Sequence, residues 1–338
     1  MQNSLLNLDE IVECLKSAAE PSRLRILKLL AGNDLTVSDL TTILGQSQPR
    51  VSRHLKLLLE AKLINRWQEG SWALFRLNPK GQASDLIARM LSHIDDSDEV
   101  FGRDLERLAE VKEARRTRAS DYFSTNAKSW DEIRSMHVSD DLVETALAGI
   151  VGTGPFNAML DIGTGTGRML ELFAPYCRSA MGIDSNREML NVARSNLDSQ
   201  GIDQAEVRHG DVYNLALGRD VFDLIIIHQV LHFLDDPQAA VREAVRALAP
   251  SGKIVIVDFA SHDQEFLRDQ HQHQRLGFDD AVVNNWLESH ELSVQEPAIV
   301  SGVTGSGQGA ALTVKIWSAT DTRYLMADQA SSHEKEIA

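Results

Sequence analysis

The apolar positions along the first 95 residues predict four helices and a β-hairpin. Apolar residues recur with a helical period over Leu15–Leu30, and Pro21 marks the start of a helix within this segment. Leu63–Arg66 and Trp72–Leu77 alternate between apolar and polar residues on either side of a turn, which is the pattern of two short antiparallel strands. A group of short helices followed by such a hairpin indicates a winged-helix module.

A helix, a turn and a second helix lie between these two patterns. Ser38 is expected to cap the first helix, SDLTTIL, Gly45 allows the chain to turn, and Ser47 is expected to cap the second helix, QPRVSRHLKLLLEAKLI. The second helix has an apolar stripe, made of Val51, Leu55 and Leu58. We expect the opposite face to be exposed; it is polar and basic and consists of Gln48, Arg50, Ser52, Arg53, His54 and Lys56.

From about Asn157 the pattern changes to apolar strands that alternate with amphipathic helices. Such an alternation predicts a parallel sheet covered by helices on both faces. Two later strand candidates, LSVQEPAIV and LTVKIWSAT, lie close together across a Gly-rich turn, so that one of them can run antiparallel. The fold class is therefore α/β overall, with a winged helix-turn-helix of α+β type ahead of a Rossmann-like domain.

The segment Asp95–Ser120 has a thin helical stripe and is expected to form a linking or dimer-forming helix. We accordingly divide the chain into a winged helix-turn-helix domain over residues 1–94, this linker over residues 95–120, a Rossmann-like domain over residues 121–320 and a disordered tail over residues 321–338.

Composition excludes several classes of protein. The two cysteines, Cys14 and Cys177, have neither a disulfide framework nor metal-binding spacing around them. The N-terminal residues carry acids where a signal peptide needs basic residues, and no apolar run approaches the length of a membrane span. We expect a cytoplasmic protein with no membrane partner and no metal.

Taken over the whole chain, the net charge of −15 argues against a nucleic-acid partner, because phosphate groups repel an acidic surface. The charge is unevenly distributed, however, since residues 1–95 hold 12 Lys+Arg against 10 Asp+Glu. Within Gln46–Arg66 five basic residues face one acid, Glu60. A local basic patch of this kind is typical of a module that binds DNA, because Lys and Arg gain free energy by displacing phosphate counterions.

A Gly-rich loop, LDIGTGTGR, directly follows the first strand of the second domain. Its glycines, Gly163, Gly165 and Gly167, follow a GxGxG spacing rather than the GxGxxG of dinucleotide binders, which weakens a nicotinamide interpretation. Asp184 closes the next strand and can bind both hydroxyls of a ribose. Asp211 is expected to close the third strand and to accept from an exocyclic adenine amine, with Val212 donating its backbone amide.

These motifs, together with FDLIIIHQVLHFLDDP, resemble the successive motifs of class I S-adenosylmethionine-dependent methyltransferases over about Tyr122–Ala319. The resemblance implies a seven-stranded, mostly parallel sheet with S-adenosylmethionine or S-adenosylhomocysteine in its cleft. It places Gly163 and Gly165 against the methionine part of that ligand, and His228 with Gln229 beside the sulfonium. We also assign a group of neighbouring residues to the nucleoside site: Asp161, Thr164, Gly167, Ser185 and Met189.

The segment YFSTNAKSWDEIR precedes the first strand and is a candidate lid over the nucleoside, with Tyr122 and Arg134 as candidate ligand contacts. Trp130 in the same segment is equally well explained by core packing. A polar segment, SHDQEFLRDQHQHQRLGF, contains three histidines and is expected to line the cleft as a helix on which Glu265 and Arg268 pair, rather than to hold a metal.

The first domain is similar to the ArsR/SmtB family of winged-helix repressors through LKSAAEPSRLRILKLL and SQPRVSRHLKLLLEAKLI. The resemblance implies a homodimer that reads a two-fold symmetric double-stranded DNA operator, with the second helix of the motif in the major groove. Many members bind metals through cysteines in the preceding helix. Here Thr36 and Ser38 occupy those positions, and hydroxyl groups are poor ligands for soft metals.

Two functions fit these patterns. In the first, a transcriptional regulator binds S-adenosylmethionine or S-adenosylhomocysteine as an effector and controls genes of the methionine cycle. In the second, a working small-molecule methyltransferase regulates its own gene through the DNA-binding domain. The fusion favours the regulator, while the absence of an obvious base in the sequence excludes neither, because methyl transfer mainly needs in-line positioning of the acceptor.

Overall fold

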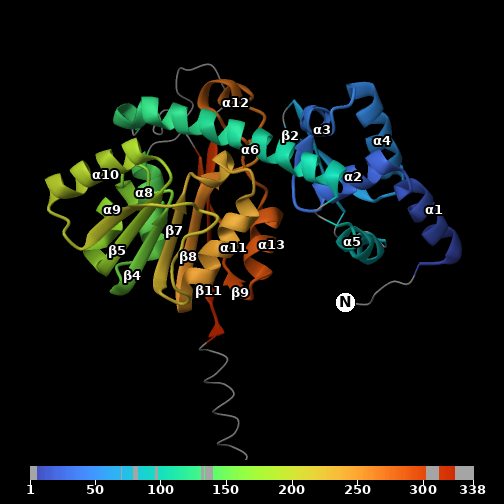
Figure 1. Cartoon of the computed structure of the whole chain (residues 1–338). Helices are drawn as coiled ribbons and strands as arrows, with labels where there is room; N and C mark the ends of the chain where they lie inside the picture. Colours follow the sequence, from blue (N-terminus) through green and yellow to red (C-terminus); the bar gives the residue numbers. More distant parts are fainter. Residues whose placement is uncertain are drawn as a thin grey trace, which may run out of the picture. The chain divides into compact units, whose positions relative to one another are not determined.

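The computed structural model describes residues 6–69, 71–78, 83–95, 98–130, 133, 140–301 and 312–323. These residues form two compact units, Met1–Thr117 and Arg118–Ala338, which are coloured blue to teal and teal to red in Figure 1. The boundary falls inside one helix, α6 (Glu99–Asn126), which contributes residues to both units. The expected disordered tail lies outside the described residues beyond Arg323.

The first unit contains a helix-turn-helix followed by a hairpin. Its elements are α1 (Leu8–Ala18), α2 (Pro21–Leu30), β1 (Leu35–Thr36), α3 (Val37–Leu44), α4 (Gln48–Glu60), β2 (Ile64–Glu69), β3 (Trp72–Leu77), α5 (Ser84–Ser92) and the start of α6. The strands pair antiparallel in the order β1-β3-β2. The described residues before Asp95 form five helices, one more than predicted, while the predicted helix start at Pro21 is confirmed, with Glu20 capping α2.

The capping of α3 also differs from the prediction. Thr36, not Ser38, is the N-cap: its hydroxyl accepts from the Asp39 amide at 3.1 Å, and the Asp39 carboxylate accepts from the Thr36 amide at 2.9 Å. This reciprocal capping box satisfies two amide groups at once, which Ser38 could not do. Gly45 ends α3 with φ of 63°, as the turn requires, whereas Ser47 begins α4 without a side-chain cap.

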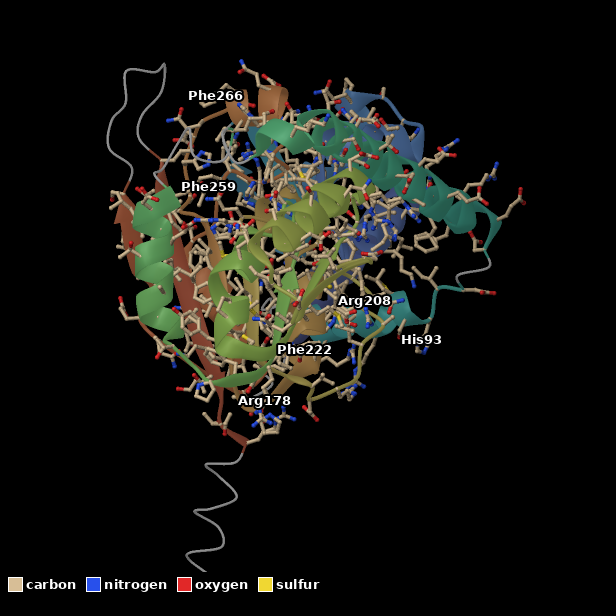
Figure 2. All side chains as sticks on the ribbon, turned by 90° about the vertical axis from the view of Figure 1, so that its left-hand side faces the viewer. His93, Arg178, Arg208, Phe222, Phe259 and Phe266 are labelled. Carbon is tan, nitrogen blue, oxygen red and sulfur yellow. The ribbon has the colours of Figure 1, made fainter. Side chains whose placement is uncertain are left out.

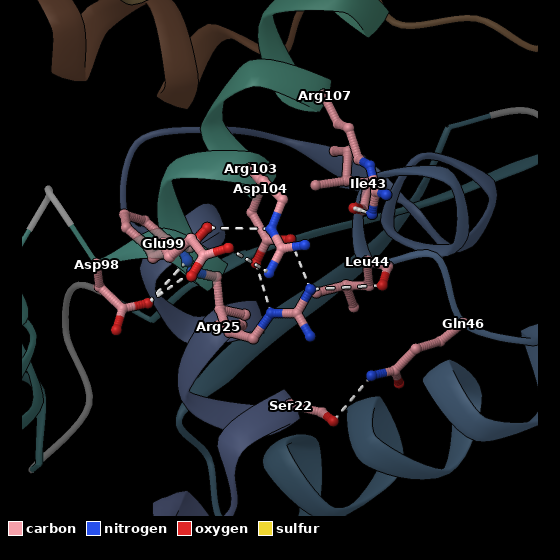
Figure 3. Close-up of polar contacts among 12 residues, drawn as sticks. Ser22, Arg25, Ile43, Leu44, Gln46, Asp98, Glu99, Arg103, Asp104 and Arg107 are labelled. Atoms are coloured by element: carbon pink, nitrogen blue, oxygen red, sulfur yellow. Dashed lines mark hydrogen bonds and ion pairs between the residues drawn. The ribbon is translucent and has the colours of Figure 1, made fainter.

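Helix α6 is fixed to the first unit by polar contacts (Figure 3). Arg25 donates through Nε and Nη2 to the two carboxylate oxygens of Asp104, both at 2.5 Å, and Asp104 is fully buried. Further along the helix, Arg107 donates to the Ile43 carbonyl at 3.1 Å. Removing one partner of a buried, paired charge costs about 3–5 kcal/mol, so these contacts hold α6 firmly against this unit.

The second unit is built on one sheet with the strand order β10-β11-β8-β7-β4-β5-β6, to which β9 adds on β11. The strands are β4 (Phe156–Ile162), β5 (Cys177–Asp184), β6 (Ala205–His209), β7 (Phe222–His228), β8 (Leu248–Phe259), β9 (Leu292–Val294), β10 (Ala298–Ser301) and β11 (Thr313–Asp321). The five strands from β6 to β8 run parallel, and β11 runs antiparallel to β8. Seven strands thus form the main path of the sheet, in agreement with the expected seven-stranded, mostly parallel sheet, and β9 is an addition to it.

Helices cover both faces of this sheet, as the sequence predicts (Figure 1). They are α8 (Asp140–Val151), α9 (Arg168–Phe173), α10 (Arg187–Gln200), α11 (Pro237–Ala247), α12 (Phe266–His271) and α13 (Asp280–Glu288). Apolar residues of α8 and α9 pack on one face, and those of α11 and α13 pack on the other. The strand order reverses at β4, with β5 on one side and β7 on the other. At such a reversal the loops at the carboxyl ends of the strands diverge and leave a ligand crevice.

The amino-terminal and carboxyl ends of the parallel strands lie at opposite edges of the sheet. Figure 2 shows Arg178 and Phe222 at the amino-terminal ends of β5 and β7, and Phe259 at the opposite, carboxyl end of β8. The predicted ligand residues lie near the carboxyl ends, so that end of the sheet is the candidate site.

Candidate functional site

Helix α4 exposes a polar face, which is the candidate nucleic-acid interface. Six predicted contact residues are exposed on it or at its start: Ser47, Gln48, Arg50, Ser52, Arg53 and Lys56. Among the residues that the structure describes, Arg50 and Arg53 form no ion pair, and Lys56 pairs only with Glu60 at 3.8 Å. An ion pair between two exposed side chains contributes little, so this face keeps its positive charge available for phosphate.

His54 does not belong to this face, and the prediction that it is exposed there is wrong. Its side chain is buried on the inner side of α4, with Nδ1 3.7 Å from the Glu20 carboxylate. Desolvation lowers the pKa of His54, while the nearby Glu20 acts in the opposite direction. The helical period places His54 beside Val51, Leu55 and Leu58, which form the inner stripe.

The glycine loop after β4 bends sharply towards β5. Gly163, Gly165 and Gly167 have φ values of 73°, 52° and 89°, and the Gly163 amide donates to the Ile183 carbonyl at 2.7 Å. A Cβ atom at Gly163 would lie 2.3 Å from Cγ2 of Val230 in the loop after β7. The absence of side chains therefore lets the loops after β4 and β7 approach each other at the strand-order reversal.

Asp161 and Thr164 support this loop from behind. The Thr164 hydroxyl donates to the Asp161 carboxylate at 2.6 Å, and both side chains are buried. Gly182 in β5 leaves room for this pair of side chains, because a Cβ atom on Gly182 would lie 2.6 Å from the Thr164 hydroxyl. The two residues belong to the candidate site as supports of the loop.

Asp184 lies at the end of β5, directly beside the glycine loop. Its carboxylate accepts from the Gly165 amide at 2.9 Å and from the Asn186 amide at 2.7 Å, one bond to each oxygen. Each oxygen retains capacity for a further donor such as a ribose hydroxyl. Desolvation raises the pKa of Asp184, and hydrogen bonds from the backbone amides of Asn186, Gly165 and Ser185 oppose this shift. Of the neighbouring candidates, Ser185 is exposed and Met189 is buried in α10.

The loop after β6 lies next to Asp184. Strand β6 ends at His209, two residues before the predicted end, and the Gly210 amide donates to the Asp184 carbonyl at 3.0 Å. Asp211 is exposed, and its carboxylate accepts from the Tyr213 amide at 2.9 Å. Val212 is buried. The structure thus brings together the glycine loop, Asp184 and the Asp211 turn at one edge of the sheet.

The loop after β7 completes this edge. His228 is the last residue of β7 and is buried, and its register places it beside the start of the glycine loop on β4. Gln229 has a φ of 52°, and its amide donates to the Val257 carbonyl at 2.7 Å. This unusual backbone turns the chain so that the Gln229 side chain lines a pocket.

The segment before the first strand contributes aromatic side chains. Tyr122 lies at the end of α6, where its hydroxyl is 2.7 Å from Nδ1 of His271, and Trp130 lies 3.8 Å from the position of a Cβ atom at Gly165. Asn186 donates through Nδ2 to the Ser120 carbonyl at 3.0 Å. Arg134 lies outside the described residues. Trp130 is half-buried and lines the same pocket as Gln229.

The sequence does not predict the pocket itself, which is a partly open hollow within the second unit. Its aromatic walls include Tyr122, Trp130, Phe233 and Phe259. His232 also lines the pocket, and its Nδ1 lies 2.7 Å from the buried carboxylate of Asp258. The motifs VLHFLDDP and VDF contain both residues, but nothing in the sequence connects them.

The histidine-rich segment lies at this pocket. The segment contains α12, on which Glu265 and Arg268 come within 3.5 Å of each other, and His271 and His273 line the pocket. Among the described residues, no group of three or more His, Cys, Asp or Glu side chains is arranged to hold a metal ion. None of the described helices combines the length and apolar character needed to span a lipid bilayer.

Two family models match separate parts of the chain. The model of the bacterial regulatory proteins of the arsR family matches residues 20–66, and a methyltransferase-domain model matches residues 160–256. The first stretch covers the helix-turn-helix and the start of the hairpin. The second runs from the strand before the glycine loop into β8.

Individual relatives divide in the same way. The arsenic resistance transcriptional regulator ArsR1 of Pseudomonas putida is 36% identical over 100 residues, which cover 29% of this chain and 77% of that protein. The transcriptional repressor SdpR of Bacillus subtilis is 34% identical over 83 residues, covering 25% of this chain and 91% of the repressor. The uncharacterised methyltransferase YcgJ of Bacillus subtilis is 30% identical over 139 residues, covering 40% of this chain and 53% of that protein. The chain thus spans about half the length of this methyltransferase relative.

Proposed function

The chain belongs to the arsR family of bacterial regulatory proteins and carries a methyltransferase domain, and from this premise we propose a ligand-responsive transcriptional regulator. In this proposal the second unit binds S-adenosylmethionine or S-adenosylhomocysteine as an effector, and the first unit binds an operator in double-stranded DNA. The regulator acts in the cytoplasm, and its target genes belong to the methionine cycle, whose products are these nucleosides.

The exposed face of α4 supports the DNA-binding part of the proposal. Gln48, Ser52 and Arg53 are the side chains that reach base edges in the major groove, while Arg50 and Lys56 bind phosphates. An α-helix fits the major groove only when its outer face is free of the protein's own packing. The inner position of His54 removes it from this set.

An apolar stripe on α1 supports a homodimer. Leu8 is 76% exposed and Leu15 is 43% exposed, and Val12 lies between them one helical turn from each. Exposed apolar side chains aligned on one face of a helix mark a surface that a partner covers. A second copy of the chain provides the same stripe, so the two stripes can pack in an isologous contact that matches a two-fold symmetric operator.

The edge formed by the glycine loop and Asp184 supports nucleoside binding, and it is the observation that carries the proposal. Gly165 leaves space beside the loop, since a Cβ atom there would approach nothing closer than Trp130 at 3.8 Å. The Asp184 carboxylate can accept both ribose hydroxyls, and the turn at Asp211 and Val212 can bind the adenine. S-adenosylmethionine supplies an activated methyl group on its sulfonium when it is bound.

Helix α6 supports a coupling between the two functions. In the first unit, Arg115 donates to the Asp39 carboxylate at 2.6 Å. In the second unit, Ser120 and Ser124 of the same helix accept from the Asn186 side chain at 3.0 and 2.9 Å, two residues after Asp184. A nucleoside that shifts Asp184 and Asn186 therefore acts on the helix that is hydrogen-bonded to the capping box of α3. We assign the coupling to α6. In this proposal the helix has two arrangements, and both the nucleoside and the operator change the populations of these arrangements.

A working methyltransferase whose DNA-binding domain regulates its own gene is the second candidate. The aromatic pocket with His232 and Asp258 favours it, because a regulator that only binds nucleosides has no need of a second pocket beside the nucleoside site. The two candidates share the nucleoside site and differ in whether turnover occurs.

A direct experiment uses the full-length protein. Isothermal titration calorimetry with S-adenosylhomocysteine is expected to give a micromolar or tighter dissociation constant. Duplexes selected by the protein from a random pool, with and without that nucleoside, are expected to converge on a two-fold symmetric site. The absence of nucleoside binding, or selected DNA without symmetry or consensus, would contradict the proposal.

A further inference from the structure

The pocket beside the nucleoside site has an uncharged, aromatic lining. None of its lining residues, within the part of the chain that the structure describes, is Lys, Arg, Asp or Glu. Its polar groups come from Gln229, three histidines, the indole N–H of Trp130 and the Tyr122 hydroxyl, which is already 2.7 Å from His271. Such a surface favours a flat, neutral, aromatic ligand over an anion or a cation, because a charge would be desolvated there without a direct counter-charge.

His232 is held rigidly in this lining. Its Nδ1 lies 2.7 Å from the Asp258 carboxylate, and its backbone amide donates to the same carboxylate at 3.3 Å. The Phe233 and His273 rings lie 4.0 and 4.2 Å from its ring centroid. His232 is 1% exposed and Asp258 is fully buried, so the imidazole has one orientation.

The Asp258 contact also fixes the tautomer of His232. An ionised carboxylate only accepts hydrogen bonds, so the proton of a neutral imidazole lies on Nδ1 and the lone pair lies on Nε2. Nε2 points away from Asp258, because the two ring nitrogens lie on different sides of the ring. The pocket therefore offers one oriented acceptor in an otherwise aromatic wall.

The pocket adjoins the loop that we assign to the nucleoside. Gln229 lines the pocket, and the next residue, Val230, packs against Gly163 so closely that a Cβ atom on Gly163 would lie 2.3 Å from Cγ2. Trp130 also lines the pocket, and its Nε1 would lie 3.8 Å from a Cβ atom on Gly165, which is an ordinary contact distance. A molecule in the pocket and a nucleoside on the loop would be neighbours.

We propose that this pocket binds a planar aromatic compound with a hydroxyl group, and that His232 is the base that takes the hydroxyl proton during methyl transfer. The proposal rests on nucleoside binding as proposed above. The acceptor oxygen forms a bond to the methyl carbon as the bond from that carbon to the sulfonium sulfur breaks. The O–H proton moves to Nε2, and the products are an aryl methyl ether, S-adenosylhomocysteine and protonated His232 stabilised by Asp258.

This chemistry would also change the state of the regulator. The transfer converts a bound S-adenosylmethionine into S-adenosylhomocysteine in the same cleft, so the acceptor compound would decide which of the two effectors the protein carries. The hydroxyaryl compound is then a second signal that the regulator reads.

The binding test uses 2-naphthol as the hydroxyaryl probe and naphthalene as the probe without a hydroxyl. Each is titrated into full-length protein saturated with S-adenosylhomocysteine, and the quenching of tryptophan fluorescence is measured. 2-Naphthol is expected to bind at least about tenfold more tightly than naphthalene, the factor that corresponds to one hydrogen bond of about 1.4 kcal/mol. In His232→Asn the two affinities are expected to become equal, whereas in the control His290→Asn, outside the pocket, the tenfold difference stays.

The turnover test supplies S-adenosylmethionine and 2-naphthol and measures 2-methoxynaphthalene by mass spectrometry. His232→Asn is expected to lower kcat by about 10²–10⁴-fold, the range for loss of a general base, and to leave the dissociation constant of S-adenosylhomocysteine unchanged. A purely structural role for His232 would change nucleoside binding as well.

The possible outcomes distinguish the acceptor site from the nucleoside sensor. Equal binding of the two probes to the wild-type protein, or binding of 2-naphthol without methylation, overturns the acceptor site and leaves the nucleoside sensor standing. Absence of nucleoside binding in calorimetry overturns the proposed function itself. Unfolding curves would reveal whether His232→Asn folds. If it does not, the comparison of 2-naphthol with naphthalene in the wild-type protein still tests whether the pocket prefers a hydroxyaryl compound.

Discussion

The guanidinium group of Arg115 lies 2.6 Å from Oδ1 of Asp39, and Oδ2 of the same Asp39 closes the capping box of α3 with Thr36. One carboxylate therefore connects α6 to the first helix of the helix-turn-helix. Both side chains are largely shielded, with 15% and 12% exposure, so the ion pair is only partly screened by water. The two residues lie 76 positions apart in the chain.

We predict that this ion pair transmits the effect of the nucleoside. Arg115→Gln should leave nucleoside affinity unchanged but reduce the change in operator affinity that the nucleoside causes, from the 5–150-fold that is typical of allosteric proteins to about twofold or less. The measurement is operator binding by fluorescence anisotropy with and without S-adenosylhomocysteine. The matched control is Arg103→Gln, whose pair with Glu99 is exposed, and which should retain the full effect. Full coupling in Arg115→Gln would exclude this contact from the pathway.

The outer face of α4 leads to a prediction on DNA affinity. Arg53→Ala should weaken binding to the selected operator by about 1–3 kcal/mol, because a bidentate contact to a guanine is lost. Lys56→Ala should weaken binding to all sequences and lower the slope of log affinity against log salt by about one, because one phosphate contact is lost. Arg178→Ala, at the amino-terminal end of β5 in the other unit, removes the same charge and should change neither quantity. Unchanged affinity in both α4 variants would remove the helix from the interface.

Asp184 leads to a prediction on nucleoside binding. Asp184→Asn keeps the size of the side chain but replaces one acceptor oxygen with a donor, so it should weaken S-adenosylhomocysteine at least about 100-fold, as expected for the loss of two charge-assisted hydrogen bonds. Asp198→Asn, on the exposed end of α10, is the control and should bind normally. Calorimetry measures both. NADH should not compete, and tighter binding of NADH than of either sulfur nucleoside would refute the assignment.

The apolar stripe on α1 leads to a prediction on oligomeric state. Leu15→Glu places a charge in the proposed contact between two copies and should convert a dimer into a monomer in light scattering after size exclusion. Leu142→Glu changes a leucine of similar exposure, 47%, in α8 and should remain dimeric. A wild-type monomer, or a dimer that survives Leu15→Glu, would contradict the assignment of this surface.

His262 leads to a prediction on pH. Desolvation lowers the pKa of His262 to about 4, below its ordinary value of 6.5. Between these values the unfolded chain binds a proton that the folded chain does not, so the free energy of unfolding falls as pH falls. The expected loss from His262 between pH 7 and pH 5 is about 1–2 kcal/mol after allowance for its partial exposure.

Urea unfolding of the full chain at the two pH values measures this loss. His262→Asn should reduce the difference between pH 7 and pH 5 by that amount, because an amide does not titrate in this range. The exposed His93 provides the control, since His93→Asn should retain the wild-type difference. An identical pH dependence in His262→Asn and the wild type would show that His262 is protonated equally in both states.

The main parts of the fold could be predicted from the sequence because their signals are local. The apolar strands, the glycine loop and the acid at the end of β5 follow one another within short segments, and a parallel sheet brings the carboxyl ends of its strands to one edge. The helix-turn-helix was predictable for the same reason, since the turn at Gly45 and the stripe of α4 are patterns within one segment.

Relationships between distant residues could not be predicted. His232 and Asp258 lie 26 residues apart, and only the pairing of β7 with β8 brings the loop after β7 to the end of β8. His54 was misplaced because its polar side chain suggested an exposed position, whereas the helical period places it inward. Capping by Thr36 in place of Ser38 was missed because both residues suit an N-cap, and the partner Asp39 selects between them.

The central claim is that nucleoside binding and operator binding are thermodynamically coupled. The most direct test measures four affinities with the full-length protein: operator with and without saturating S-adenosylhomocysteine, and the nucleoside with and without saturating operator. Linkage requires the two ratios to be equal, and we predict a common factor between about 5 and 150 at physiological salt. Operator curves that superimpose with and without either sulfur nucleoside, at low and at physiological salt, would contradict the regulator and leave the autoregulated enzyme as the better explanation.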